Sequence, residues 1–235
     1  MSKICLIRQP AGIGDIFFTQ KIAKDYISKG YTVIWPIIEQ FEFIKDYIKI
    51  DGLTFVNENE SFEYKNIYME GYSTLIKLNE NDVYLPIQHF DRHYPNQSVM
   101  YSKYNLLGID YRDWADFFEF NRNEKKEEEL IDLLGIRGKK YNFVNRNYGS
   151  PPHSQNCQHM STYENSVEME FIDGYNIFDW IGVILNAEHI YTAETSLLYL
   201  LTKLNLNNIT VYSKHNPPNY FHVSELFPKN WNYTL

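Results

Sequence analysis

A loop near the start of the chain carries the first residues suited to chemistry. The apolar run from Lys3 to Arg8 leads into PAGIGD and then into a helical pattern, which predicts a strand, a loop and a helix. Gly12 and Gly14 let the backbone turn tightly, and the helix start supplies unpaired N–H groups for an anion. Asp15 lies at this turn, where its carboxylate either caps the helix or acts as a general base.

The loop differs from two well-known phosphate-binding loops. No Lys-Ser or Lys-Thr pair follows Gly14, and the three-glycine spacing of a dinucleotide fingerprint is incomplete. The sequence therefore predicts neither a P-loop nor a complete dinucleotide-binding site.

A second strand-to-helix junction carries polar side chains near the C-terminus. The expected strand from His189 to Thr192 leads through AETS into the helical pattern TSLLYLLTKLN. The hydroxyls of Thr195 and Ser196, with the adjacent amides, suit a diphosphate, and Glu194 suits a ribose or sugar hydroxyl. The alternative interpretation of these residues is an ordinary helix cap.

Cationic side chains follow two other expected strands. Arg146 comes directly after the strand YNFVN, and Lys214 and His215 come after the last strand. A guanidinium holds phosphate through two parallel hydrogen bonds. Arg146 is thus either a phosphate ligand or a surface arginine, and Lys214 is a further candidate for phosphate.

A histidine-rich segment offers a competing metal site. Alternate residues of an extended segment share a face, so His89, Asp91 and His93 can bind a transition metal. That arrangement would make the protein a metal-dependent hydrolase, although the other nearby candidate ligands fit no zinc spacing: His153, Cys157 and His159. The alternative interpretation places His89, Asp91 and Arg92 against an acceptor substrate.

Two successive series of alternating strands and helices must position these residues. The expected strands are Lys3–Arg8, Tyr31–Pro36, Leu53–Asn57, Val83–Ile87, Tyr141–Asn145, Val167–Ile172, His189–Thr192 and Asn208–Tyr212, with helical patterns between many of them. Such alternation is typical of a parallel sheet covered by helices. We therefore predict an α/β protein with two small Rossmann-like domains facing across a cleft.

The domain boundary is predicted from a charged stretch in the middle of the chain. NRNEKKEEELIDLLGIRGKK separates the two series and carries a narrow apolar stripe, which favours a solvated connecting helix. We expect an acceptor-side domain over residues 1–120, a connecting helix over 121–138 and a donor-binding domain over 139–235.

Composition limits the classes of function. The 235 residues carry a formal net charge of −8, which argues against a nucleic-acid surface. No apolar run is long enough to span a membrane, and the first residues lack the apolar region of a signal peptide. With only two cysteines, a disulfide framework is not expected. We expect a cytoplasmic protein without a membrane span.

The two junctions together resemble those of bacterial heptosyltransferases. The opening ICLIRQPAGIGDIFFTQKIAKDY is similar to that family's strand, Gly-Asp loop and helix, and ETSLLYLLTKLNLNNITVYSK is similar to its donor-binding Asp-Ser/Thr-Gly-x-x-His segment. Asp15 falls on the family's catalytic aspartate. Glu194 stands in place of Asp, Ser196 in place of Gly and Tyr199 in place of His, so the resemblance does not support a heptose donor.

A weaker resemblance links the chain to fucosyltransferases. Their Gly-Gly-x-Gly-Asn opening is similar to the loop around Gly12, and their second domain carries an arginine motif that grips the donor diphosphate. FVNRNYGS, with Arg146, lies at the corresponding place.

The resemblance implies a metal-independent, inverting glycosyltransferase of the two-Rossmann-domain type. Asp15 would take the proton from an acceptor hydroxyl as it attacks a nucleotide sugar. The implied donor site comprises Gly12, Gly14, Arg146, Glu194, Thr195, Ser196 and Lys214. The chain carries no Asp-x-Asp triplet for a divalent metal, so we expect no cofactor and only two partners, a nucleotide-sugar donor and a glycan or other hydroxyl acceptor.

Two other classes of function stay open at this point. A non-catalytic nucleotide- or sugar-binding module of the same fold is consistent with the short second domain, and the metal-dependent hydrolase is consistent with the histidines. The sequence leaves the sugar, the nucleotide, the acceptor and the oligomeric state undetermined.

Overall fold

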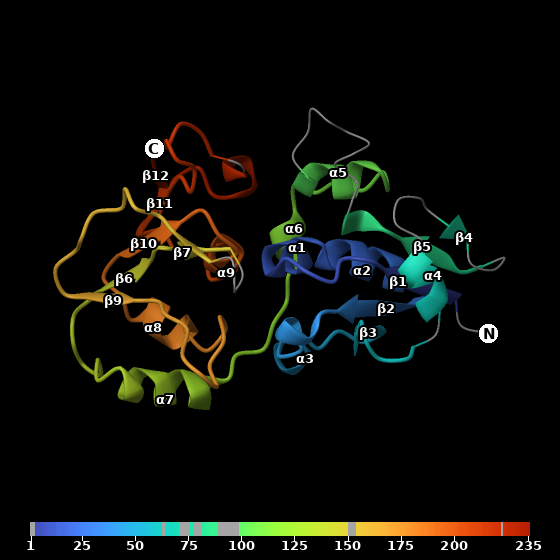
Figure 1. Ribbon diagram of the computed structural model, residues 1–235, viewed down its shortest axis with the longest axis horizontal. Coiled ribbons are helices and arrows are strands. Elements are labelled where there is room, and N and C mark those ends of the chain that lie inside the picture. Colours follow the sequence, from blue (N-terminus) through green and yellow to red (C-terminus); the bar gives the residue numbers. More distant parts are fainter. Residues whose placement is uncertain are drawn as a thin grey trace. The chain divides into compact units, whose positions relative to one another are not determined.

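The computed structural model of the chain describes residues 3–62, 64–70, 76–77, 81–88, 99–149, 154–221 and 223–235. The chain divides into two compact units, Met1–Asn121 (unit 1) and Arg122–Leu235 (unit 2). Each unit contains a mainly parallel sheet with helices packed on it, as Figure 1 shows. The predicted α/β class with two parallel sheets is confirmed.

Unit 1 follows the predicted alternation of strands and helices. Its elements are β1 (Lys3–Ile7), α1 (Ile13–Phe18), α2 (Gln20–Ser28), β2 (Tyr31–Ile37), the 3₁₀ turn η1 (Glu39–Phe41), α3 (Ile44–Tyr47), β3 (Leu53–Asn57), α4 (Lys65–Glu70), β4 (Ile76–Lys77), β5 (Val83–Leu85), α5 (Val99–Asn105) and α6 (Trp114–Phe117).

The sheet of unit 1 has a change of direction beside its first strand. In the described residues the strand order is β3-β2-β1-β5-β4, with β4 antiparallel to β5 and the other pairs parallel. After β1, the chain adds β2 and β3 on one side of β1. It then crosses to the other side of β1, where β5 pairs with it. Ligands of open α/β sheets bind at such a switch point, outside the carboxyl ends of the strands.

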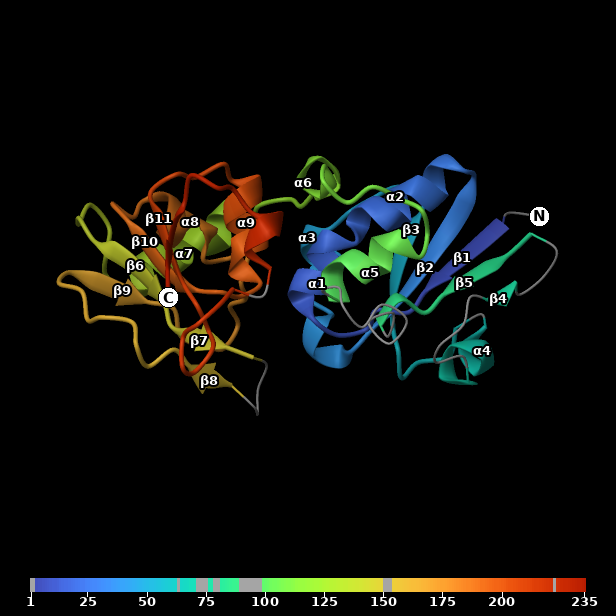
Figure 2. The ribbon, with the colours of Figure 1, turned by 90° about the horizontal axis from the view of Figure 1, so that it is seen from above.

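Apolar periodicity explains α1 and α2, the two helices between β1 and β2. The side chains of Ile16, Phe17 and Ala23 are fully buried, as their helical spacing predicts. Figure 2 shows α2 lying along the sheet, where it packs on β2. Gly30 ends this helical segment with φ of 84°, a conformation that glycine adopts without steric cost.

Unit 2 also alternates strands and helices, and its described residues form fewer helices than those of unit 1. Its elements are α7 (Glu124–Leu133), β6 (Asn142–Asn145), β7 (Asn147–Tyr148), β8 (Gln155–Asn156), β9 (Ser166–Glu168), α8 (Ile181–Leu185), β10 (Ile190–Ala193), α9 (Leu197–Lys203), β11 (Ile209–Tyr212), the 3₁₀ turn η3 (Ser224–Leu226) and β12 (Asn232–Thr234).

The sheet of unit 2 is parallel throughout its described strands, in the order β12-β11-β10-β6-β9. The chain leaves β6 for β9 on one side and returns with β10 on the other, so β6 and β10 flank a second switch point. The short antiparallel pair β7–β8 follows β6 directly. The carboxyl ends of β6, β10 and β11 therefore share one edge with this pair.

The helix expected to connect the domains packs within unit 2. Figure 1 shows α7 stacked on α8, and Leu130 and Ile131 are buried there. Glu127 is 2% exposed and takes hydrogen bonds from Arg122 at 2.9 and 2.5 Å. A Cβ on Gly182 of α8 would lie 2.9 Å from the Cβ of Glu127, so the close approach of these two helices requires glycine.

In the described part of the chain, no helix is both long and apolar enough to cross a membrane.

Candidate functional site

Asp15 lies in the first turn of α1 without capping it. The N-cap position is Gly12, and no side chain makes a capping hydrogen bond there. The Asp15 side chain is 28% exposed. A helix cap, one of the two interpretations that the sequence left open, is therefore not the role of this carboxylate.

Gly12 makes room for the carboxylate. Its backbone has φ of 82°, and a Cβ added there would lie 2.4 Å from Asp15 Oδ2. Any other residue would meet both backbone strain and a steric overlap with Asp15. The glycine that the sequence assigned to an anion site thus shapes the space around Oδ2. Gly14 is buried inside α1.

A buried lysine holds the other carboxylate oxygen. Lys103 of α5 has a side chain only 1% exposed, and its Nζ lies 3.1 Å from Asp15 Oδ1. The same ammonium donates to Gln9 Oε1 at 2.6 Å and to the Ile87 carbonyl at 3.1 Å. Gln9 follows β1 and Ile87 follows β5, so this cluster lies at the switch point of unit 1.

Gln9 also orders the loop that precedes Asp15. Its Nε2 donates to the Ala11 carbonyl at 2.5 Å, and its own carbonyl accepts from Trp35 Nε1 at 3.0 Å. The Pro10 carbonyl accepts from Ile38 N at 3.1 Å. These bonds tie the loop to β2 and fix the start of α1.

Glu194, at the second junction, is directed into unit 2. The residue is 1% exposed, and its Oε1 accepts a hydrogen bond from Val223 N at 2.7 Å. Its Oε2 is buried and has no hydrogen-bond partner among the residues that the structure describes. Glu194 thus anchors the segment that follows β11, and its predicted contact with a donor hydroxyl stays a prediction.

The Thr195 hydroxyl accepts hydrogen bonds from the start of α9 and from the end of β6. Its Oγ1 accepts from Leu197 N at 3.3 Å and from Asn145 Nδ2 at 3.1 Å. Asn145 also donates to Thr192 Oγ1 at 3.0 Å, which joins β6 to β10 at their carboxyl ends. Ser196 is the N-cap of α9, but its hydroxyl makes no capping hydrogen bond.

Arg146 is bonded inside unit 2. Its guanidinium donates to Glu168 Oε1 at 3.1 Å, to the Met160 carbonyl at 2.7 Å and to the Ser161 carbonyl at 2.6 Å. The side chain is 11% exposed. Arg146 pins the loop at residues 160–161, and a phosphate contact would require it to exchange these partners.

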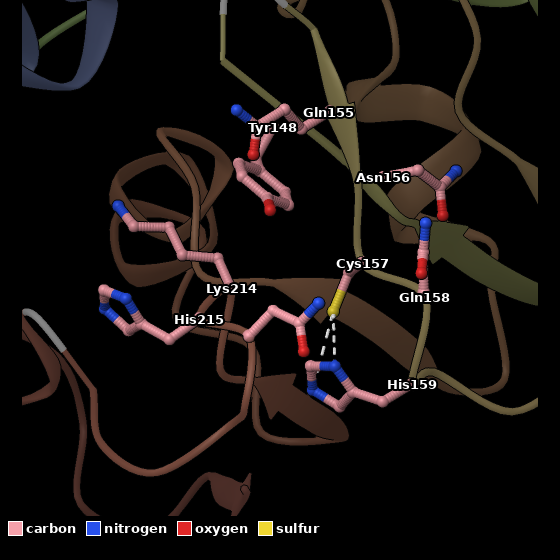
Figure 3. Close-up of a pocket in the computed structure, with 9 residues that line it drawn as sticks. Tyr148, Gln155, Asn156, Cys157, Gln158, His159, Lys214 and His215 are labelled. Atoms are coloured by element: carbon pink, nitrogen blue, oxygen red, sulfur yellow. Dashed lines mark hydrogen bonds between the residues drawn. The ribbon is translucent and has the colours of Figure 1, made fainter.

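A cavity of about 470 Å³ opens beside the carboxyl edge of the unit 2 sheet. Figure 3 shows side chains around it that come from the β7–β8 pair, the turn after β8 and the segment after β11. The described residues that line it are Tyr148, Gln155, Asn156, Cys157, Gln158, His159, Lys214, His215 and Asn216. Lys214 carries the one fixed positive charge of this described set, which contains no Asp or Glu.

The thiol at the floor of the cavity is not an activated nucleophile. Cys157 Sγ lies 3.6 Å from both ring nitrogens of His159 and donates to the Ser213 carbonyl at 3.4 Å. Burial raises the pKa of the Cys157 thiol above its ordinary value. The thiol therefore stays protonated at neutral pH, whereas a nucleophilic cysteine needs the thiolate.

Several predicted residues lie outside the described part of the chain. These are the acceptor candidates His89, Asp91 and Arg92, together with His93 and His153 of the competing metal site. Among the described residues, no group of three or more His, Cys, Asp or Glu side chains is arranged to hold a metal ion.

Comparisons with solved structures show what this arrangement is similar to. A family 9 glycosyl transferase from Veillonella parvula DSM 2008 matches with a TM-score of 0.53 at 11% identity, covering 99% of this chain and 86% of that one. The iron-containing dodecameric glycosyltransferase TibC from enterotoxigenic E. coli H10407 matches with a TM-score of 0.52 at 10% identity. The heptosyltransferase TibC in complex with ADP-D-beta-D-heptose matches with a TM-score of 0.51 at 11% identity.

The likeness is one of fold. The match to TibC covers 90% of this chain and 58% of the TibC chain. The match to TibC with ADP-D-beta-D-heptose covers 94% of this chain and 61% of that chain. No protein-family profile and no curated protein sequence matches the chain. In fold, the chain resembles glycosyltransferases of the heptosyltransferase kind, as the two sequence junctions predicted.

Sequence reasoning missed Lys103, Gln9 and most of the cavity. Lys103 lies in α5, and nothing in the sequence sets it apart from other lysines. Gln9 adjoins the glycine loop and was the easier of the two to suspect. The cavity residues are polar side chains from segments far apart in the chain, so no local pattern marks them.

Proposed function

We propose that this protein is a glycosyltransferase that moves a sugar from a nucleotide-sugar donor to an acceptor hydroxyl, without a metal ion and with inversion at the anomeric carbon. The observation that carries the proposal is the Asp15 carboxylate, which is 28% exposed, caps no helix and lies at the switch point of unit 1. The fold, similar to that of solved glycosyltransferases, supports it.

The proposed reaction is a single displacement. The acceptor oxygen forms a bond to the anomeric carbon while the bond from that carbon to the donor phosphate oxygen breaks, and its electron pair leaves with the nucleoside diphosphate. The acceptor proton passes to Asp15, which acts as general base. Attack on the face opposite the leaving group inverts the configuration.

We place the nucleoside diphosphate at the cavity of unit 2. Lys214 has no ion pair among the described residues and lines a cavity whose described lining contains no carboxylate, so its charge is available to the leaving diphosphate. The size of the cavity suits a small-molecule ligand. The half-buried Ser196 hydroxyl at the same sheet edge completes the proposed donor contacts.

The remaining predicted residues have supporting places in the proposal. Arg146 holds residues 160–161, next to the cavity-lining His159. Glu194 holds Val223, in the segment that follows Lys214. His89, Asp91 and Arg92 follow β5 in the sequence and stay the predicted acceptor contacts. Gly12 serves Asp15.

The first experiment is a thermal-shift screen of the full chain against nucleoside diphosphates and ADP-, UDP-, GDP- and CMP-linked sugars, each with and without EDTA. Binding to the folded state raises the melting temperature, and ligand at about 100 times Kd adds about 2.7 kcal/mol of stability. We expect one nucleotide class to raise the melting temperature, unchanged by EDTA.

Two lysine variants test the place of the donor. Lys214→Met should abolish the shift because it removes the charge from the cavity. Lys229→Met removes an exposed lysine elsewhere in unit 2 and should keep it. An equal shift in both variants would exclude Lys214 from the donor site, and no shift with any nucleotide up to millimolar concentration would contradict the proposed function.

A non-catalytic binding protein of the same fold is the second candidate. The internal bonds of Thr195 and Glu194 favour it, because the predicted donor segment is used for folding. A donor-dependent shift without release of nucleoside diphosphate, with water or any glycan as acceptor, would support this candidate. Release that is lost with EDTA would instead support a metal-dependent enzyme that uses His89, Asp91 and His93.

A further inference from the structure

The ammonium of Lys103 is paired inside unit 1. Its side chain is 1% exposed, and it donates hydrogen bonds to Gln9 Oε1 at 2.6 Å and to the Ile87 carbonyl at 3.1 Å, while it forms an ion pair with Asp15 Oδ1 at 3.1 Å. A buried charge is tolerated when it is paired and fully hydrogen-bonded. Within the described residues, Asp15 is the one carboxylate that pairs with it.

The three partners come from separate parts of the chain. Gln9 follows β1, Ile87 follows β5 and Asp15 lies in the first turn of α1, while Lys103 itself comes from α5. The two neutral acceptors directly follow the ends of the adjacent parallel strands β1 and β5, and the strands of a core are generally the last elements of a domain to open. The ammonium is therefore fixed to the sheet and in turn fixes Oδ1 of Asp15.

The second carboxylate oxygen has a different environment. Within the described residues, Asp15 Oδ2 makes no hydrogen bond and lies next to the α-carbon of Gly12, where a Cβ would approach to 2.4 Å. The two oxygens of Asp15 are therefore not equivalent, since one is held by a buried cation and the other is left without a partner.

We infer that Lys103 is a positioning residue for the proposed reaction, which holds Oδ1 of Asp15 so that Oδ2 is the oxygen that accepts the proton of the acceptor hydroxyl. This inference rests on the proposed function. The acceptor O–H bond breaks, its proton joins Oδ2, and the acceptor oxygen bonds to the anomeric carbon as the diphosphate leaves with its electron pair. Lys103 neither gives nor takes a proton in this step.

Replacement of Lys103 by methionine separates orientation from substrate binding. Methionine keeps most of the buried volume and removes the charge. We expect Lys103→Met to lower kcat for release of nucleoside diphosphate about 10- to 100-fold, because misplacing a reacting group by about 1 Å costs this much. The donor KM should change by less than about twofold, since the donor contacts lie in unit 2.

Lys21→Met is the matched control. Lys21 is also a largely buried lysine of unit 1, and it pairs with Asp113 and donates to the Asp110 carbonyl at 2.5 Å. This variant loses comparable contacts but none to Asp15, so kcat should stay within about twofold of the native value. Equal kcat values for the two folded variants would overturn the inference.

Two glycine variants test the role of Oδ2. Gly12→Ala and Gly30→Ala introduce the same strain, because the two residues have φ of 82° and 84°, but a Cβ at Gly30 meets nothing within 4 Å. Gly12→Ala should lower kcat at least about tenfold beyond Gly30→Ala, because its Cβ displaces the carboxylate. The same kcat in both variants would overturn the assignment of Oδ2.

A denaturation cycle distinguishes failure of this inference from failure of the proposed function. Unfolding of the native protein, Asp15→Asn, Lys103→Met and the double variant measures the coupling of the two side chains without any substrate. A coupling is expected, and additive effects would overturn the inference even in an active enzyme. Coupling in a protein that turns over no nucleotide sugar would instead show the proposed function to be wrong, and the positioning role with it.

Discussion

The two strand-to-helix junctions look alike in sequence and differ in structure. β1 leads into α1 through Gly12 and Asp15, and β10 leads into α9 through Glu194 and Thr195. The first carboxylate is 28% exposed, whereas Glu194 is 1% exposed. An acidic residue at a helix start is thus directed outward or inward by other parts of the fold.

Distant segments cause this difference. At the first junction α5 brings Lys103, which holds one oxygen of Asp15 and leaves the other without a partner among the described residues. At the second junction the chain after β11 brings the N–H of Val223, which bonds to Oε1 of Glu194 and draws the carboxylate into the unit. The first carboxylate therefore keeps one oxygen without a partner in the described structure, whereas the second holds the segment after β11 in place.

The largest effect should separate the two carboxylates by turnover. Asp15→Asn should lower the rate of nucleoside diphosphate release about 10²- to 10⁴-fold, the usual contribution of a general base. Glu194→Gln keeps an oxygen for Val223 N and should lower the rate by less than about fivefold. Steady-state assays of both purified variants check this, and a reversed order would show that the second junction carries the chemistry.

Asp15→Asn should also reduce stability, because Lys103 loses its charged partner. We expect a loss of about 1–3 kcal/mol in the free energy of unfolding, as for other buried groups left without a partner. Since Asp15 caps no helix, this loss of stability would report the Asp15–Lys103 pair, and donor binding measured by thermal shift is the control for folding. An unchanged stability would mean that the Asp15–Lys103 pair contributes nothing to the fold.

Glu194→Ala should show the structural role of the second junction. It leaves the N–H of Val223 without its acceptor and should cost about 1–3 kcal/mol of stability, measured by urea denaturation. Glu188→Ala, at a 53% exposed side chain that pairs with Lys140, is the control and should cost less than about 0.5 kcal/mol. Similar losses in both variants would argue against Glu194 as an anchor.

Thr195→Val tests a smaller contribution of the second junction. It should lower the free energy of unfolding by about 1 kcal/mol, because it removes the oxygen that accepts from Leu197 N and Asn145 Nδ2. Thr202→Val, inside α9, removes a donor to the Leu198 carbonyl and should have little effect. Thermal denaturation compares the two variants. Loss of the nucleotide-induced shift in Thr195→Val alone would give its hydroxyl a place in the donor site.

The smallest effect concerns the behaviour of unit 2 in acid. Burial lowers the pKa of His189 below its ordinary value of 6.5, and its Nε2 lies 2.9 Å from Thr210 Oγ1. The folded state thus binds this proton less readily than the unfolded state, so the stabilising contribution is present above pH 6.5 and is lost as the pH falls below it. His189→Gln should flatten the decline of melting temperature between pH 7 and pH 5, and an unchanged pH profile would contradict this.

Apolar runs and turn residues predicted much of the fold, because strand and helix formation depends largely on neighbouring residues. Leu53 to Asn57 matches β3, and the apolar run from Lys3 matches β1 to within one residue. The β7–β8 pair and α6 were not predicted, since each is a short polar or mixed segment whose structure depends on what it packs against. The expected connecting helix packs on α8 with Leu130 and Ile131 buried, and its buried Glu127 pairs with Arg122, a contact that the charge pattern did not reveal.

The sequence by itself determined the alternation of strands and helices, the glycine loop before Asp15 and the resemblance to glycosyltransferases. Only the tertiary structure decided which polar groups are free. Glu194, Thr195 and Arg146 have the right chemistry for a donor, yet each is bonded inside unit 2, while Lys103 acquires importance through a contact across 88 positions of sequence. Periodicity and turn residues act over a few neighbouring positions, whereas the pairing of a buried charge depends on distant segments that meet only when the chain has folded.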